Sequence, residues 1–396
     1  MPASTALTDA SRVSHKEDIT QHEIDALKTE FNLADAHTHQ KQSPSQRDIV
    51  ASLPDIWYQS EQRTQFEAER AFIEAFYTLH GQHTALERID HIYLVYAASI
   101  GMQITATYLM KHRMRVGLIE PCFDNLHDLM KHAQIPLFPL DESLFHDAST
   151  VYDNLMKNAL TLDAIVLVDP NNPTGFSQFA RDSKPFLEVV RFCCDFNKIL
   201  ILDFSFASFM LASGGRRPDV YRILENSGVR YIAMEDTGKT WPLQDAKCAT
   251  ILTSRDLNDE IYNIVTSVLL NVSPFVLNIV TRYVLDSQQD GFASVGDLLQ
   301  RNRVRAIEHL DKGILRYQTP LIRTSVAWFE IADPELSADQ LQHCLLQSRI
   351  YVLPGKYFFW KHPVRGQRFI RVALARDETL FQNAMYAMED ALHELQ

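Results

Sequence analysis

The sequence predicts an α/β fold, with a mainly parallel seven-stranded sheet in a large domain and a smaller α+β domain at the C-terminus. Seven short apolar runs occur between residues 91 and 253, and helical patterns separate them. The runs lack the polar alternation of a half-exposed strand, which is typical of strands covered by helices on both faces. After residue 310 a second, shorter set of strand and helix patterns follows, which predicts the smaller domain.

The first 50 residues precede the predicted sheet and are mostly polar. They contain a helical stretch near residues 21–31 and a His/Gln-rich segment over residues 36–46. Composition alone is typical of a mobile tail. The role of this N-terminal segment is therefore open at this stage.

The predicted strands of the large sheet follow in chain order. They lie at residues 91–96, 115–120, 135–140, 163–169, 198–203, 230–235 and 248–253. Helices between them are predicted at residues 102–112, 125–132 and 184–196. Ligands of such sheets bind at the carboxyl ends of the strands, so functional residues are expected there.

A long helical region, residues 274–310, separates the two predicted domains. Strands are predicted beyond it at residues 325–331 and 367–374, and helices at residues 338–347 and 378–395. The chain therefore divides into an N-terminal segment (1–50), a large domain (51–290) and a small domain (291–396), with a cleft between the two domains.

Composition excludes several classes of partner. Lys and Arg number 38 against 50 Asp and Glu, a net charge of −12, which argues against nonspecific binding of nucleic acid or of an anionic membrane. The five cysteines form no C-x-x-C pair, no leader is recognisable, and no apolar run approaches eighteen residues. These features predict a soluble protein of a reducing, cytoplasmic compartment, and no H-E-x-x-H or Cys/His spacing predicts a metal site.

One lysine stands at the end of a predicted strand. Lys239 follows the apolar run 231–234 in the sequence Glu-Asp-Thr-Gly-Lys, and burial there would lower the pKa of its amine and make it nucleophilic. A single lysine is more often a surface residue. Three further signals occur along the chain: Asn-Asn-Pro-Thr-Gly at residues 171–175, Asp203 at the end of a strand, and Arg371 within an apolar run. Together they resemble the pyridoxal-phosphate (PLP) site of the fold-type I aminotransferase superfamily.

The resemblance implies a role for each of these residues. Lys239 would bind PLP covalently, and Asp203 would pair with the protonated ring nitrogen. Asn172 would donate to the phenolic oxygen, and Arg371 would hold the substrate α-carboxylate through two parallel hydrogen bonds. Taken alone, Asp203 could equally be a helix cap at a strand end.

The remaining cofactor contacts are predicted around these four. The turn Ala98-Ser99-Ile100 follows a strand and opens a helix, where free N–H groups and the Ser99 hydroxyl could hold a phosphate. Such turns are also ordinary strand–helix connections. Phe123 is placed to stack on the ring, although a strand-end Phe is usually core. The cofactor set also includes Ser205 and Lys247, which stands where the superfamily usually carries a phosphate-binding arginine.

Two positions depart from an ordinary aminotransferase. Phe206 replaces a tyrosine three residues after the pyridinium aspartate, and Asp236 replaces a phosphate-binding serine three residues before the lysine. A carboxylate beside a phosphate is repulsive, so we expect Asp236 to face the substrate and to favour a cationic side chain.

A closer resemblance covers nearly the whole chain. The segments 19–23, 32–37, 60–63, 123–125, 235–242, 272–274 and 353–354 look like the PLP-dependent L-arginine hydroxylase/oxidase family of the mannopeptimycin (enduracididine) pathway. In that family the N-terminal segment is a lid over the active site. By resemblance Glu23 and Asp236, with Asp35, would bind the guanidinium, while Thr20 and His37 would approach the reacting face. The alternative for His37 is a solvated histidine-rich loop.

The resemblance implies oxidation of L-arginine by O2, with PLP and no metal or flavin. The products would be 4-hydroxy-2-oxoarginine, 2-oxoarginine or both, with ammonia and H2O2, and His37 would act as general base or position a water. Three alternatives stay open: an aminotransferase of a basic amino acid, a hydroxyarginine cyclase, and a PLP-fold regulator without activity. The superfamily also implies a homodimer.

Overall fold

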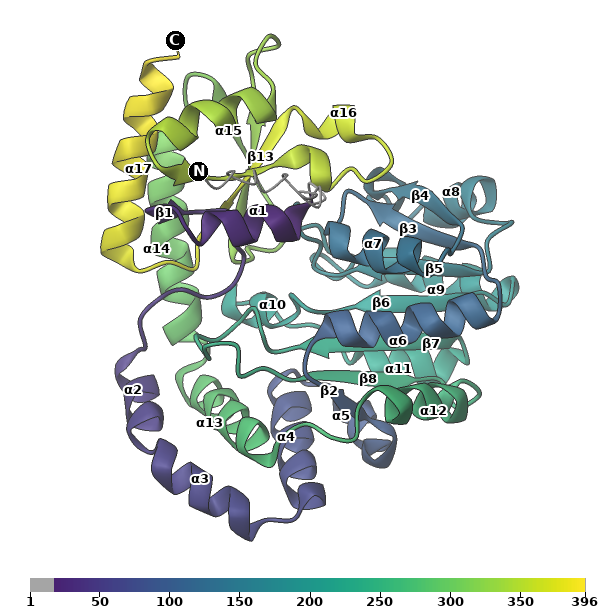
Figure 1. The fold of residues 1–396 in the computed structure, drawn as a ribbon. Coiled ribbons are helices and arrows are strands. Elements are labelled where there is room, and N and C mark those ends of the chain that lie inside the picture. Colours follow the sequence, from purple (N-terminus) through teal and green to yellow (C-terminus); the bar gives the residue numbers. More distant parts are fainter. Residues whose placement is uncertain (1–17, 396) are drawn as a thin grey trace, which may run out of the picture.

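A seven-stranded sheet with helices on both faces is the largest unit of the computed structural model, which describes residues 18–395 (Figure 1). The first 17 residues of the predicted N-terminal segment lie outside the described part. In spatial order the strands are β2 (Tyr93–Val95), β8 (Ala249–Thr253), β7 (Arg230–Asp236), β6 (Ile199–Asp203), β5 (Ala164–Val168), β3 (Val116–Glu120) and β4 (Leu137–Asp141).

The strands of this sheet are mainly parallel, as predicted. The pairs β3–β4, β3–β5, β5–β6 and β6–β7 are parallel, and only β8 runs against its neighbours β7 and β2. Every residue of β3, β5, β6 and β8 is buried, which explains why these strands are mostly apolar and lack a polar alternation in the sequence. The carboxyl ends of β5, β6 and β7 therefore open at one edge of the sheet.

Helices cover both faces of the sheet (Figure 1). Three of them match the predicted helices to within a few residues: α6 (Ala98–Lys111), α7 (Asp124–His132) and α9 (Lys184–Asp195). Helix α6 begins four residues before its predicted start, because the N–H of Ala98 is capped by the side chain of Asp236 from β7. The other helices here are α5 (His83–Leu86), η1 (Ile89–His91), η2 (Glu142–Phe145), α8 (Val151–Asn158), α10 (Ser208–Ala212), α11 (Val220–Ser227) and α12 (Asn258–Val268).

The region predicted as one long helical stretch is two helices, α13 (Pro274–Asp290) and α14 (Ala293–Leu310). The break falls at Gly291 and Phe292, whose φ angles of 62° and 66° are left-handed and cannot continue an α-helix. Helix α13 packs against α4 (Gln65–Leu79), α3 (Leu53–Gln62) and α2 (Pro44–Ala51).

A four-stranded antiparallel sheet forms the C-terminal part. Its order is β12 (Leu353–Pro354), β13 (Phe369–Ala373), β10 (Val326–Ile331) and β9 (Leu315–Gln318). The helices beside it are α15 (Ala338–Gln347), η3 (Gly355–Tyr357), α16 (Pro363–Gly366) and α17 (Glu378–His393). The domain limits near residues 50 and 290 stay a prediction.

The N-terminal segment packs on this C-terminal sheet. Helix α1 (Ile19–Ala26) is shorter than the predicted stretch of residues 21–31, because Phe31 and Asn32 form strand β1. Strand β1 pairs in parallel with β11 (Ile350–Tyr351), so a partner more than 300 residues away overrides the local helical pattern. Within residues 18–395 no helix is long and apolar enough to cross a membrane.

Candidate active site

A cavity of about 260 Å³ lies where the ends of β5, β6 and β7 face the N-terminal segment. It brings together twelve of the residues predicted from the sequence: Thr20, Glu23, His37, Ala98, Ser99, Phe123, Asn172, Asp203, Ser205, Asp236, Lys239 and Lys247. Asp35 and Arg371 stand directly behind its wall, bonded to His37 and to Asn172. Ile100 is set back, and its N–H donates to the carbonyl of Ala97.

Lys239 lines this cavity from the turn after β7. Desolvation lowers the pKa of its amine, and the charge of Lys247 adds to the effect, while Glu23, Asp35 and Asp236 oppose it. The Lys239 Nζ is 3.1 Å from Nε2 of His37. A lysine with a depressed pKa beside an imidazole is suited to nucleophilic attack and to proton transfer.

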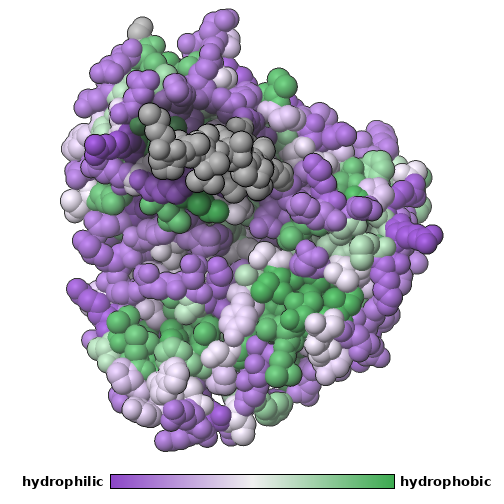
Figure 2. Space-filling model, viewed as in Figure 1, coloured by the Kyte–Doolittle hydropathy of each residue, from purple (hydrophilic) through white to green (hydrophobic). Residues whose placement is uncertain are grey.

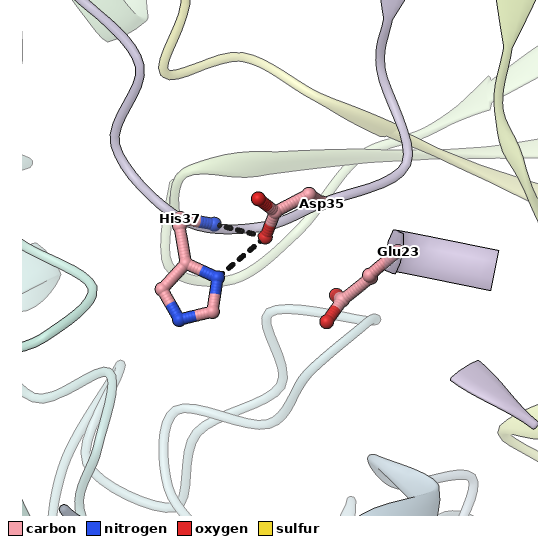
Figure 3. A group of neighbouring side chains, drawn as sticks. All are labelled: Glu23, Asp35 and His37. Carbon is pink, nitrogen blue, oxygen red and sulfur yellow. Dashed lines mark hydrogen bonds and ion pairs between the residues drawn. The ribbon is translucent and has the colours of Figure 1, made fainter. Parts of the chain in front are cut away.

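His37 is held by a buried carboxylate. Asp35 accepts hydrogen bonds from the His37 N–H at 2.8 Å and from its Nδ1 at 2.5 Å (Figure 3). A third bond comes from His39 Nε2 at 2.6 Å. Burial alone would raise the pKa of Asp35, but the two imidazole hydrogen bonds outweigh it and hold the pKa well below its usual range. The hydrogen-bonded pair of His37 and Asp35 differs from the alternative of a solvated histidine-rich loop, in which His37 would have no buried partner.

Glu23 projects from α1 toward the same space (Figure 3). Its carboxylate, Asp35 and His37 offer ligand atoms within 4.8 Å of one another, close enough for a metal ion. Each of the three side chains also has a partner in the protein: Glu23 is paired with Arg371 at 3.1 Å, Asp35 is bonded to His37, and His37 lies 3.1 Å from Lys239.

Asp203 provides a test of whether the site suits PLP. Its Oδ1 accepts the N–H and hydroxyl of Ser205, and burial raises the pKa of the carboxyl, with repulsion from Asp236 adding to the effect. Among the described residues no lysine or arginine forms an ion pair with Asp203. A buried carboxylate that lacks a cation fits a cationic ring nitrogen, so the residues present fit PLP.

Two of the three residues predicted to hold the phosphate at the turn 98–100 have backbone N–H groups that are bonded within the protein. The two oxygens of Asp236 accept the N–H groups of Ala98 at 2.8 Å and Gly238 at 2.6 Å. The Ala98 N–H is therefore already bonded, as is that of Ile100. The Ser99 hydroxyl and N–H remain as donors for a phosphate, together with the Lys247 ammonium, which donates to Oδ1 of Asp245 at 3.1 Å and has two further N–H donors.

Arg371 is fully buried on β13. It donates to Oδ1 of Asn172 at 3.2 Å, to Oε1 of Glu23 at 3.1 Å and to the carbonyl of Ala34 at 2.5 Å. Burial lowers the pKa of Arg371, and the carboxylate of Glu23 opposes that shift. Its Nε has no hydrogen-bond partner among the described residues, so the guanidinium retains a donor for a further carboxylate.

Three residues that sequence reasoning did not single out support the site. Arg376 donates to the carbonyl oxygens of Asn32, Asp35 and His37, and so clamps the segment that carries His37. His39 bonds Asp35, and Asp124 accepts the N–H of Ile19 at the start of α1. Arg376 and Asp124 bond backbone groups, which leave no pattern in a sequence; only the histidine spacing at residues 37 and 39 was a visible signal.

The family model for class I and II aminotransferases matches residues 61–387. None of the curated proteins matches the sequence significantly.

Solved structures match over nearly the full length. The chain is similar to MppP, solved after soaking with its product 2-ketoarginine, at 28% identity and a TM-score of 0.82, covering 91% of this chain and 99% of that chain. It is also similar to LysN, the α-aminoadipate aminotransferase of Thermus thermophilus, at 14% identity and a TM-score of 0.75, covering 97% and 96%. The aspartate aminotransferase of the same organism shows 12% identity and a TM-score of 0.75, covering 95% and 97%. The last two show the fold alone.

The family match extends over the whole predicted sheet and most of the C-terminal part, and the resemblance noted in the sequence is confirmed by the likeness to MppP. The chain therefore belongs to the class I and II aminotransferase family of PLP-dependent enzymes.

Proposed function

We propose that this enzyme oxidises L-arginine with O2 and PLP, and releases 2-oxoarginine, 4-hydroxy-2-oxoarginine or both, with ammonia and H2O2. The observation that carries the proposal is the placement of His37, held by Asp35, at 3.1 Å from Lys239 by an N-terminal segment that also brings in Glu23. The likeness to MppP, whose structure was soaked with 2-ketoarginine, supports the same substrate class.

The chain's own residues account for binding of the substrate. The planar fork of Arg371 suits the α-carboxylate, and the acidic Glu23 and Asp236 suit a guanidinium. The Glu23 carboxylate is paired with the Arg371 guanidinium at 3.1 Å. We infer that the substrate carboxylate takes the place of Glu23 on Arg371, which frees Glu23 for the guanidinium.

Proton transfer falls to Lys239 and His37. When bound, PLP supplies a sink for the electron pair left on the substrate Cα. The Lys239 amine, with its lowered pKa, takes the proton from Cα. His37 Nε2 faces the same space and accepts a proton from the water that adds at Cγ, while Thr20 lines the adjacent wall. Helix α1 and the loop behind it cover the cavity and limit entry of other water.

The oxidation balances with O2 alone as the oxidant. Each two-electron oxidation reduces one O2 to H2O2, and hydrolysis of the C–N bond releases ammonia. The 2-oxo acid requires one such oxidation, and the 4-hydroxy-2-oxo acid requires a second O2 because its hydroxyl oxygen comes from water. The ratio of O2 consumed to arginine consumed therefore reports the product.

The test uses the purified holoenzyme with L-arginine and no added 2-oxo acid. We expect O2 consumption, H2O2 and ammonia, with 2-oxoarginine, 4-hydroxy-2-oxoarginine or both identified by mass spectrometry. His37→Ala should still consume some O2 but yield less hydroxylated product. A reaction that proceeds equally well without O2 contradicts the proposal.

A second candidate is an aminotransferase of a basic amino acid, favoured by the family match and by the likeness to LysN. It predicts that 2-oxoglutarate supports turnover in the absence of O2 and is converted to glutamate. A hydroxyarginine cyclase would instead yield a cyclic product that keeps its α-amine. Phe206 and Asp236, which depart from the usual aminotransferase residues, weigh against the aminotransferase.

The enzyme is also proposed to be a homodimer. Apolar side chains gather on one face of the molecule, over β2 and α12 (Figure 2). Three apolar residues, Leu270, Phe66 and Tyr262, line one hollow of the surface beside β2, where they are 92%, 60% and 49% exposed. Such a contiguous apolar surface is typical of an interface, and a second copy of the chain is the partner that the family resemblance implies.

A further inference from the structure

His39 is the second histidine that bonds the buried carboxylate of Asp35. Asp35 Oδ1 accepts two hydrogen bonds from His37, and Asp35 Oδ2 accepts one from His39 Nε2 at 2.6 Å. The side chain of Asp35 is only 6% exposed, whereas that of His39 is 38% exposed. His39 therefore links this buried carboxylate to the surface of the molecule, as does His37, whose side chain is 32% exposed.

The backbone around His39 is fixed on the C-terminal part of the chain. The His39 N–H donates to the carbonyl of Ala375 at 2.9 Å, and His39 forms a parallel bridge with Arg376. Arg376 in turn donates to the carbonyl oxygens of Asp35 and His37. The backbone is thus held at both ends, and the rotation of the Asp35 carboxylate is restricted by the bond from His39 at Oδ2 together with the two bonds from His37 at Oδ1.

The orientation of Asp35 decides which nitrogen of His37 carries the proton. A carboxylate at 2.5 Å from Nδ1 requires the proton on Nδ1. Nε2 of a neutral His37 then presents a lone pair toward Lys239 Nζ, at 3.1 Å. If Asp35 turned or became protonated, the proton would move to Nε2 and the lone pair would face away from the site.

We propose that His39 is a positioning residue: by donating to Oδ2 of Asp35, it keeps Asp35 aimed at His37 and so keeps the His37 Nε2 lone pair directed at the reacting groups. The catalytic consequence rests on the proposed function, whereas the effect on the tautomer of His37 does not. The hydrogen bond from His39 is also one of those that hold the pKa of Asp35 low against its burial, which favours the ionised form that the arrangement needs.

The experiment compares three variants with the wild-type holoenzyme. His39→Ala and His39→Met both remove the donor, and Met keeps most of the volume if Ala disturbs the loop. His39→Gln places an amide N–H donor near the position of Nε2, but the amide, unlike an imidazole, cannot gain or lose a proton. His112→Ala is the matched control, because the side chain of His112 is also 38% exposed and also pairs with a carboxylate, Glu260, at 2.9 Å, but lies at the far end of α6, away from the site.

Two readouts are measured for each protein. Nitrogen-15 NMR of histidine-labelled enzyme, with His37 assigned by its own variant, reports the tautomer. Steady-state kinetics with L-arginine and product analysis report kcat, KM and the share of hydroxylated product. We expect the Ala and Met variants to lose the pure Nδ1–H tautomer of His37, to lower kcat about tenfold with KM changed less than about twofold, and to yield less hydroxylated product. Gln should restore both readouts, and His112→Ala should match the wild type.

Two outcomes overturn the inference. An unchanged His37 tautomer in both the Ala and Met variants shows that His39 does not hold Asp35. A Gln variant as impaired as Ala shows that His39 acts through its own proton and not as a fixed donor. If the wild type consumes no O2 with L-arginine, the proposed function fails, and the NMR comparison still decides whether His39 sets the tautomer.

Discussion

Asp124→Asn should make the enzyme more stable at alkaline pH, because Asp124 is a buried carboxyl that favours its protonated form. It is 6% exposed, in the first turn of α7, and its Oδ2 accepts the N–H of Ile19 at 2.7 Å. Burial, with repulsion from Asp128, Asp18 and Glu23, raises the pKa of Asp124 from 3.8 to about 7. The folded protein therefore binds more protons than the unfolded chain between these two values, and the free energy of unfolding falls as pH rises through this window.

The magnitude follows from the size of the shift. A change of about three pKa units, at about 1.4 kcal/mol each, corresponds to about 4 kcal/mol of destabilisation above pH 7. Asparagine carries no charge, and its amide oxygen still accepts the Ile19 N–H. Removal of a negative charge from the first turn of a helix costs about 0.3–1 kcal/mol. We therefore expect Asp124→Asn to be about 3 kcal/mol more stable than the wild type at pH 8, and no more stable at pH 4.

Urea unfolding of both proteins at pH 4 and pH 8 measures this difference. Asp153→Asn is the control, because Asp153 also stands in the first turn of a helix, α8, but is exposed. It should lose a few tenths of a kcal/mol at pH 8. If Asp124→Asn is less stable than the wild type at pH 8, the ionised carboxylate contributes more through the Ile19 N–H than burial costs, and the reasoning is wrong.

Three further outcomes are expected. Glu23→Ala should raise the Kd for L-arginine about tenfold or more, measured by isothermal titration calorimetry, because it leaves a guanidinium donor unpaired in a desolvated site. Deletion of residues 1–37 should raise the Kd in the same way. An unchanged Kd and product ratio in the deletion variant would contradict the lid. Burial lowers the pKa of His80 to about 4, so the stability that is present above pH 6.5 is lost as the pH falls toward 4. In His80→Gln the loss of unfolding free energy between pH 6.5 and pH 4 should be about 3 kcal/mol smaller than in the wild type. An equal loss in both proteins would show that other groups cause it. Leu270→Glu should convert the proposed dimer into a monomer, because it places a charge in an apolar interface, and light scattering would measure the change. A wild-type protein that is monomeric and fully active would refute the dimer.

The seven strands of the large sheet could be predicted because each is a local property of the sequence. A strand buried on both faces needs a mostly apolar run without polar alternation, and β3, β5 and β6 show one, whereas β8 includes the buried Thr250 and Thr253. The reversed direction of β8 could not be predicted, since pairing direction leaves no mark in the strand itself. Strand β1 was missed for the same reason: its two residues are extended because β11 offers a partner.

The sequence by itself determined the chemistry that the site can carry. Lys239 and Asp203 follow apolar strands, so their place at the sheet edge follows from short-range patterns, and Arg371 was visible as a charge within an apolar run. The tertiary structure alone decided which of these charged groups meet. The pair Glu23–Arg371 joins residues 348 positions apart, and the contact of His37 with Lys239 spans 202. Such contacts depend on how α1 and its loop pack on the C-terminal sheet, and packing at that distance is set by the whole fold and not by any local pattern.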